Sequence, residues 1–218
     1  MEWRKKAFFA SAYGIIPAII CSPDGAGREQ RLPGLFERNE FDSFTAVDVE
    51  TPNRYSRSIC SIGIVRVEGT GNVERLHYLV NPCDNFDAVN ISIHGIRPED
   101  VEREPGLDRI WPLIESYFTG NLIVAHNALF DLLVIRKALL REDIHTGAWR
   151  SLCTLEKSRR HIPRTAFGSH RLNDLCAGLG IPLEHHHNAL DDALACASLY
   201  EYLKNRYGCS ERDVKQFR

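Results

Sequence analysis

The stretch SFTAVDVE, residues 43–50, predicts how the fold begins. Its β-branched and apolar residues are typical of a strand, and the strand ends with two acids, Asp48 and Glu50. Side chains alternate between the two faces of a strand, so both carboxylates lie on the same face. Two carboxylates this close repel each other unless a cation lies between them, although solvated acids are also common at strand ends.

Two further strand candidates follow, SICSIGIVRVE at 58–68 and VERLHYLVNP at 73–82, and GTGN between them supplies a turn. The three runs predict an antiparallel meander. Farther along, the buried strand NLIVAHN at 121–127 leads into ALFDLLVIRKALL at 128–140, which has the length and apolar surface of a buried helix. This order predicts an α/β fold, a mixed sheet in which the meander is followed by β-α units, with helices on both faces.

Three more segments have helical patterns. PGLDRIWPLIESYF at 105–118 indicates an amphipathic helix that Pro112 is expected to shorten or kink. RLNDLCAGLGI at 171–181 and ALDDALACASLYEYL at 189–203 indicate two helices near the end of the chain.

Composition narrows the class of protein. The 218 residues suit one domain with additions, and the apolar fraction of 44% is enough for a sizeable core. The net charge of −2 does not point to nucleic acid or membrane, so a nucleic-acid enzyme would need a local basic groove around an acidic centre. The seven cysteines form no C-x-x-C, so neither a disulfide framework nor a zinc site is indicated, and we expect a reducing, cytoplasmic location.

The first 42 residues are expected to form an extension of unknown role. MEWRKK and the apolar AFFASAYGIIPAIIC resemble a secretion leader at first sight. However, the apolar part is shorter than the roughly 20 residues of a spanning helix, and Gly14 and Pro17 interrupt it. A short element packed on the domain, or a poorly ordered extension, is the expectation. The main domain is predicted at 43–205, and 206–218 is predicted as a C-terminal tail.

Two more acids lie at the starts of predicted helices. Asp131 is in the first turn of the helix at 128–140, where the helix N-terminus favours an acid and apolar neighbours indicate burial. Asp191 and Asp192 follow EHHHNAL at 184–190 and differ by about 100° around the helix axis, so only one can point into a shared site. The apolar and small residues expected to face the sheet are Leu190, Ala193, Leu194, Ala197 and Leu199.

Together these segments resemble the DEDDh branch of the DnaQ-like 3′–5′ exonucleases, a family with a ribonuclease-H-like fold. Three motifs carry the resemblance: DVET at 48–51, HNALFD at 126–131 and HNALDDA at 187–193. The segment ISIHGIRPEDV at 91–101 is expected to be a loop that leads into a short helix, and its part IHGIRPEDV at 93–101 also resembles a family segment near the terminal nucleotide. The resemblance covers roughly residues 43–205.

The resemblance implies a catalytic set of five residues. His187 and Asp192 fill the family's H-x4-D spacing, which leaves Asp191, His185 and His186 outside the motif. The implied metal ligands are oxygens only, which suits two Mg²⁺ or Mn²⁺ ions. Asp48 would bridge both ions, Glu50 and Asp192 would hold the ion that activates water, and Asp131 would hold the ion near the leaving 3′-oxygen. His187 would take the proton from that water, because a neutral imidazole exists at cellular pH.

The resemblance also implies secondary contacts with the substrate. Thr51, His94 and Asn127 match positions that line the pocket of the terminal nucleotide, although capping and side-chain-to-backbone hydrogen bonds would explain them equally well. His126 is expected to be a hydrogen-bonded structural histidine rather than a catalytic group. The cations Lys157, Arg159, Arg160 and Arg164 are candidate phosphate contacts, with a solvated helix face as the alternative.

The predicted function is a metal-dependent 3′–5′ exonuclease that acts on single-stranded 3′ ends and releases nucleoside 5′-monophosphates. Resemblance of the linking segments to polymerase epsilon-subunit-like members favours DNA and makes a DNA polymerase a candidate partner; no membrane partner is expected. Trimming of RNA or short oligonucleotides is the alternative within the same class. The alternatives from other classes are a nucleic-acid-binding or protein-binding module without turnover, and metal storage by the three consecutive histidines.

Overall fold

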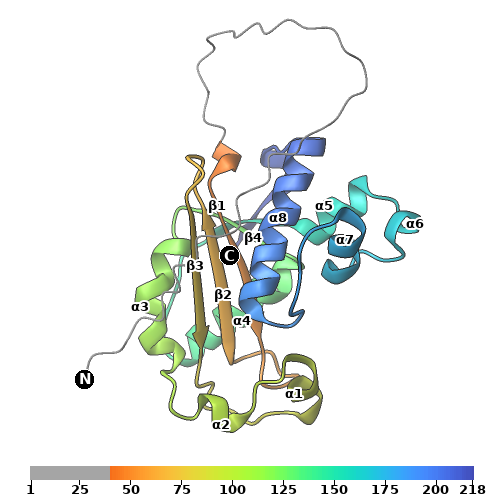
Figure 1. The fold of residues 1–218 in the computed structure, drawn as a ribbon. Helices are drawn as coiled ribbons and strands as arrows, with labels where there is room; N and C mark the ends of the chain where they lie inside the picture. Colours follow the sequence, from red (N-terminus) through yellow and green to blue (C-terminus); the bar gives the residue numbers. More distant parts are fainter. Residues whose placement is uncertain (1–39) are drawn as a thin grey trace, which may run out of the picture. The chain divides into compact units, whose positions relative to one another are not determined.

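The run SFTAVDVE forms strand β1 (Phe44–Glu50) in a computed structural model that describes residues 40–218 (Figure 1). Strand β1 pairs antiparallel with β2 (Ser61–Val67), and β2 pairs antiparallel with β3 (Val73–Leu79). The predicted meander is therefore confirmed. In its register Asp48 lies opposite Gly63, a pairing that matters for the site described below.

The sheet continues on the other side of β1. Strands β4 (Leu122–Ala125) and β5 (Trp149–Cys153) run parallel to β1, and β6 (Val214–Phe217) is antiparallel to β5, which gives the order β3-β2-β1-β4-β5-β6. The mixed sheet thus has the predicted arrangement. Strand β6 lies within residues that the sequence analysis treats as a tail.

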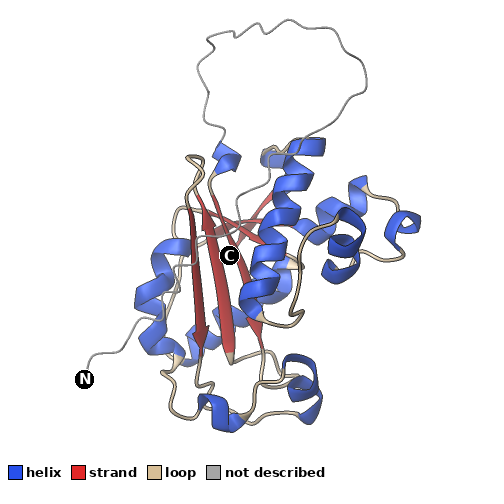
Figure 2. Ribbon diagram, in the orientation of Figure 1, coloured by secondary structure: helices blue, strands red, loops and turns tan. Residues whose placement is uncertain are grey.

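Helices cover both faces of the sheet (Figure 2). The helices of the described residues are η1 (Glu40–Asp42), α1 (Ala88–His94), α2 (Pro98–Val101), α3 (Leu107–Phe118), α4 (Ala128–Arg141), α5 (Thr154–His161), α6 (Arg164–Phe167), α7 (Leu172–Leu179), α8 (Ala189–Tyr207) and η2 (Glu211–Asp213). Part of the segment at 91–101 that was expected to be a loop is helical, as α1. Pro112 lies inside α3, which runs on past it to Phe118.

Two apolar clusters divide the faces of the sheet. Val47 and Val49 of β1 pack in the cluster formed with α3 and α4, whereas Ala46 packs in the cluster formed with α8. Because side chains alternate along a strand, Asp48 and Glu50 share the α8 face with Ala46. The described part of the chain holds no helix that is both long and apolar enough to cross a bilayer.

Helix α8 and the segment before β1 each differ from their prediction in one detail. Four of the five residues expected to face the sheet from α8 do so, but Leu199 packs in a third cluster with Leu175 of α7 and with Ile162, which directly follows α5. The leader-like segment at the start of the sequence lies outside the described residues. Phe41, placed by the sequence analysis in the extension, is buried, and its carbonyl accepts a hydrogen bond from Tyr200 at 2.9 Å.

Candidate active site

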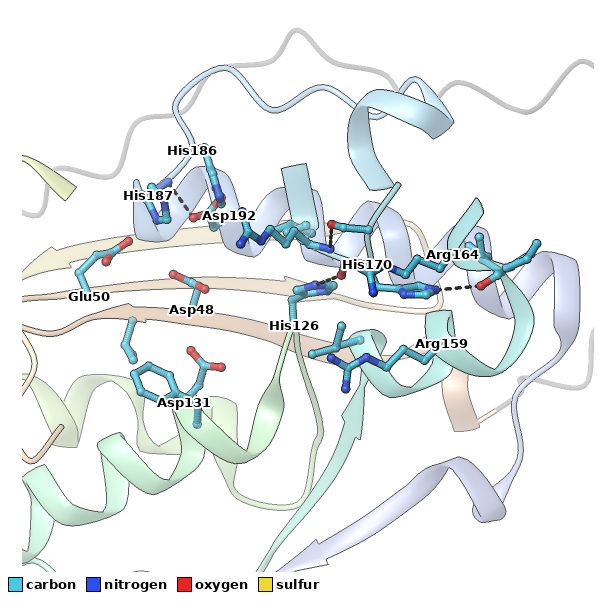
Figure 3. A pocket seen from close by; sticks show the side chains of 18 residues that line it. Asp48, Glu50, His126, Asp131, Arg159, Arg164, His170, His186, His187 and Asp192 are labelled. Atoms are coloured by element: carbon cyan, nitrogen blue, oxygen red, sulfur yellow. Dashed lines mark hydrogen bonds and ion pairs between the residues drawn. The ribbon is translucent and has the colours of Figure 1, made fainter. Parts of the chain in front are cut away.

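Three acids from two distant parts of the sequence meet at the α8 face of β1. Asp48 and Glu50 project from the strand, and Asp192 comes from the first turn of α8 (Figure 3). One oxygen from each of the three carboxylates lies within 4.8 Å of the others. Glu50 and Asp192 are buried, and Asp48 is half-buried. The spacing is short enough for a cation to be shared by all three.

Asp131 adds a fourth carboxylate from the opposite side. It lies in the first turn of α4, where only 3% of its surface is exposed, and it lines the same cavity as the other three acids. Figure 3 places its carboxylate facing Asp48, across from α8. Strand β4 ends directly before this helix, so the β4–α4 connection brings Asp131 to the carboxyl end of the neighbouring strand.

A local feature of α8 decides which of the two consecutive aspartates enters the site. The side chain of Asn188 caps the helix by accepting hydrogen bonds from the backbone N–H groups of Leu190 and Asp191, at 3.1 and 3.3 Å. With the helix start fixed, Asp192 points into the cavity and Asp191 turns away, to pair with His185 at 2.9 Å.

Gly63 permits α8 to approach β2 this closely. A Cβ atom at this position would lie 2.1 Å from the carbonyl oxygen of Ala189, the first residue of α8. Because Gly63 is opposite Asp48 in the sheet, its missing side chain lets the helix start lie directly beside the acids of β1. Gly63 is not among the predicted site residues, although a glycine inside an otherwise β-branched run such as SIGIV is a usable signal of close backbone approach.

Burial and nearby negative charge raise the pKa values of three of the four acids, Asp48, Glu50 and Asp131. Burial, the charge of Asp131 and then those of Glu50 and Asp192 raise the pKa of Asp48 well above its usual value. Burial, then Asp192 and Asp131, raises the pKa of Glu50 to about 8. Burial likewise raises the pKa of Asp131 to about 8, against hydrogen bonds from backbone N–H groups. Such a cluster stays fully ionised near neutral pH only if cations neutralise it.

Two adjacent histidines border the acids on the α8 side. Nδ1 of His186 donates to Oδ1 of Asp192 at 2.9 Å, and the backbone N–H of His187 donates to Oδ2 at the same distance. Their rings stack with centroids 3.9 Å apart, and His187 has a φ of 70°, a left-handed conformation that is uncommon outside glycine. Burial, then the charge of His186, lowers the pKa of His187 against the opposing effect of Asp192.

His186 is a residue that the sequence analysis placed outside the third motif. The structure puts it among the residues that line the cavity, in direct contact with Asp192. No spacing rule identifies it, because three consecutive histidines before a helix look alike in sequence.

His126 has structural hydrogen bonds on both ring nitrogens. Its Nδ1 lies 3.0 Å from Oγ1 of Thr154, and its Nε2 lies 2.9 Å from the carbonyl oxygen of His170. Burial, with smaller effects that include the charge of Arg159, lowers the pKa of His126 to about 4. The ring therefore stays neutral and joins α5 to the segment before α7.

The three positions expected near the terminal nucleotide are not part of the cavity lining. Thr51 and His94 lie together, since Nε2 of His94 is 3.1 Å from the Thr51 carbonyl oxygen, and the charge of His187 contributes to lowering the pKa of His94 after burial. Asn127 is exposed and has a φ of 81° at the start of α4. Thr51 and His94 therefore border the site beyond Glu50, and Asn127 lies at the surface.

The acids occupy one end of a cavity of about 900 Å³. Arginines line its other end: Figure 3 shows Arg159 and Arg164 on the side away from Glu50, together with His170. Of the four cations singled out in the sequence, Lys157 and Arg160 do not line the cavity, because both pair with Asp213, at 3.0 and 2.9 Å.

The donor set of the acidic end suits hard divalent cations. The four side chains offer carboxylate oxygens only, without a thiol, and Mg²⁺ and Mn²⁺ prefer such ligands. Burial and the neighbouring acids raise the pKa values of Asp48, Glu50 and Asp131, and bound cations would favour their ionised forms. The residues present therefore fit divalent metal ions.

The chain is similar to an exonuclease family and to part of a DNA polymerase III protein. An exonuclease family model, RNase_T, matches residues 44–200. The DNA polymerase III PolC-type protein of Oceanobacillus iheyensis is 30% identical over 173 residues, a match that covers 78% of this chain and 12% of that protein. The chain thus spans about an eighth of the length of this relative.

Solved structures share the sheet and its helices. Exonuclease X in complex with 5′ overhanging duplex DNA superposes with a TM-score of 0.63 at 24% identity, over 78% of this chain and 96% of that one. The nuclease domain of 3′hExo, a DEDDh family member bound to rAMP, superposes with a TM-score of 0.65 at 14% identity, over 81% of this chain and 98% of that one. These similarities confirm the predicted ribonuclease-H-like fold.

Proposed function

The chain belongs to the DnaQ-like family of 3′–5′ exonucleases, and on this basis we propose that it is a metal-dependent enzyme that removes nucleotides from single-stranded 3′ ends. The product would be a nucleoside 5′-monophosphate. The observation that carries the proposal is the convergence of four buried or half-buried carboxylates from β1, α4 and α8 beside His187.

We propose that Asp48, Glu50, Asp131 and Asp192 hold two divalent ions, Mg²⁺ or Mn²⁺. Such ions, when bound, polarise the phosphodiester and lower the pKa of the attacking water. The central position of Asp48 among the other three acids suits a ligand shared by both ions (Figure 3). Glu50 and Asp192 would complete one ion's ligands, and Asp131 those of the other.

His187 is proposed as the general base that accepts the proton of the attacking water. Its lowered pKa keeps the imidazole neutral and able to accept a proton at neutral pH. Its backbone N–H holds Asp192, so the base and a metal ligand are positioned by the same short segment. The left-handed backbone of His187 is consistent with strain held at a functional position.

Thr51 and His94 are proposed to contact the 3′-terminal nucleoside, with Asn127 as a peripheral contact. The hydrogen bonds of Asn90 to the carbonyl and the hydroxyl of Thr51, at 2.9 and 3.1 Å, hold this residue against α1. The position of Thr51 directly after Glu50 places it next to the acids, which supports a contact with the nucleoside whose phosphate is attacked.

DNA is the proposed substrate, and a DNA polymerase is a proposed partner, because the matched relative is a DNA polymerase III PolC-type protein. RNA trimming is the second candidate, since a structural neighbour is bound to rAMP. Single-stranded DNA and RNA of matched sequence, each labelled at the 5′ end, distinguish the two. We expect stepwise shortening that EDTA stops and Mg²⁺ or Mn²⁺ restores, faster on DNA.

Two results would overturn the proposal. Binding of either strand without any shortening in the presence of Mg²⁺ or Mn²⁺ would support the binding module instead. Loss of metal uptake on replacing His185 and His186, with His187 retained, would support metal storage.

A further inference from the structure

The cavity has opposite charge at its two ends. Four carboxylates occupy one end, and two guanidinium groups line the other: Arg159 on α5 and Arg164 on α6 (Figure 3). We call these two arginines the basic shelf. Both residues are exposed.

The basic shelf is free to bind an anion, unlike the other cations of the same helices. Within the described residues, no carboxylate lies within ion-pair distance of Arg159 or Arg164. The one side-chain hydrogen bond of Arg164 goes to the carbonyl oxygen of Gly168, at 3.2 Å. Lys157 and Arg160, in contrast, are both bound to Asp213.

The charge of the shelf reaches the middle of the cavity. After burial and a hydrogen bond to the backbone, Arg159 is among the groups that affect the pKa of His126, which lies between the acids and the shelf in Figure 3. An extended anion that starts at the acids would therefore meet positive charge farther along the same cavity.

The order of elements along β1 gives a direction for this anion. Thr51 and α1 follow Glu50, at one end of the row of acids, and the shelf lies at the other end (Figure 3). If the 3′-terminal nucleoside lies beside Thr51, as the proposed function has it, the rest of the strand leaves the acids toward the shelf. A nucleic-acid strand carries one phosphodiester per nucleotide, and a single guanidinium group can bind two oxygens of a phosphate at once.

We infer that the basic shelf binds backbone phosphates on the 5′ side of the scissile bond, so that the enzyme favours strands of several nucleotides over dinucleotides. This inference rests on the proposed function for its direction and deepens it with a substrate class. Base identity would matter little, since the contacts are with the backbone.

The test compares the double variant Arg159→Gln/Arg164→Gln with the control variant Arg160→Gln. Arg160 lies on the same helix as Arg159 and carries the same charge, but it does not line the cavity. The substrates are dT2 and dT10, or U2 and U10 where the unmodified protein degrades RNA faster. We expect kcat/KM on the ten-nucleotide strand to fall roughly tenfold in the double variant, mainly through KM. On the dinucleotide the fall in kcat/KM should be much smaller. Arg160→Gln should change kcat/KM by the same factor on both substrates.

Salt dependence provides a second readout. Each phosphate contact on a single strand contributes about 0.7 to the slope of log binding constant against log salt, so the double variant should lose about 1.4. Fluorescence polarisation with labelled dT10 in EDTA measures this without turnover. If the double variant loses the same factor of kcat/KM on both strand lengths, or if its salt slope is unchanged, the proposed role of the basic shelf is wrong.

The two proposals fail in different ways. If the unmodified protein cleaves no strand, the exonuclease proposal fails, and the shelf is then judged by dT10 binding alone. If strands are cleaved but length preference survives in a double variant that melts like the unmodified protein, the shelf fails while the exonuclease proposal stands.

Discussion

Nδ1 of His186 lies 2.9 Å from Oδ1 of Asp192, whereas His187 reaches the same carboxylate through its backbone N–H. The ring of His187 is thus left free of that carboxylate although the two histidines are adjacent and stacked. The side-chain hydrogen bond of His186 suits a positioning role, and the neutral ring of His187 suits proton transfer.

Replacing His187 with Ala should reduce kcat by about 10²–10⁴-fold with little change in KM, because a general base acts in the chemical step. Replacing His186 with Ala should have a much smaller effect on kcat, since Asp192 keeps its hydrogen bond from the backbone of His187. Single-turnover rates on a saturating strand provide the comparison. A pure binding defect in His187→Ala would rule out the base role.

The two aspartates at the start of α8 should differ sharply. Asp192→Asn should lower kcat/KM by more than about 100-fold, because it removes a carboxylate that is buried among the other acids. Asp191→Asn should lower it by less than about threefold, because its partner His185 is exposed and outside the cavity. Mg²⁺ titration of each variant measures the change in metal affinity. Equal effects of the two substitutions would contradict the helix register of the structure.

Stability without metal should fall as the pH rises. The pKa of Glu50 is raised from 4.5 to about 8, so the folded chain favours the neutral carboxyl. The resulting stabilisation is fully present below pH 4.5 and is lost as the pH rises through about 8. Thermal melts in EDTA should therefore show a falling Tm across this range. Mg²⁺ or Mn²⁺ should raise the Tm more at the alkaline end, and a metal effect that is the same at both ends would argue against binding at these acids.

Asp48→Asn should abolish turnover and at the same time raise the Tm of the metal-free protein near pH 8. The substitution removes a carboxyl group whose ionisation is opposed by burial and by the charges of Asp131, Glu50 and Asp192. Activity assays with excess Mn²⁺ and melts in EDTA measure both. Substantial residual turnover, or a lower metal-free Tm, would count against the arrangement.

Gly63→Ala should destabilise the fold by about 1–3 kcal/mol, because the new methyl group would overlap the backbone of Ala189. It should also lower activity in the molecules that fold, since it pushes the start of α8 away from β1. Gly147→Ala is the matched control, with no atom within 4 Å of the added methyl group. Urea unfolding and kcat/KM of both variants test this, and equal stability of the two would contradict the close contact.

The sequence predicted what depends on local pattern. The alternation that ends at Glu50 and the helical length of 128–140 are each readable within one segment. The five proposed catalytic residues followed from three motifs, and the structure brings all five to one cavity.

Features that depend on distant contacts were not predictable in this way. The role of His186 depends on how the turn before α8 folds back on Asp192, and the burial of Lys157 depends on Asp213, 56 residues later. Strand β6 was missed because four residues are too few to show a period, and its pairing is with β5.

Strand β6 also has a consequence for handling the protein. It covers the outer edge of β5, while the other edge of the sheet, β3, is exposed and carries charged residues such as Glu74 and Arg75. A truncation before Asp213 would uncover a row of backbone N–H and C=O groups on β5 and leave the buried ammonium of Lys157 without its carboxylate. We expect such a shortened chain to aggregate through edge-to-edge pairing, even though every proposed catalytic residue is retained.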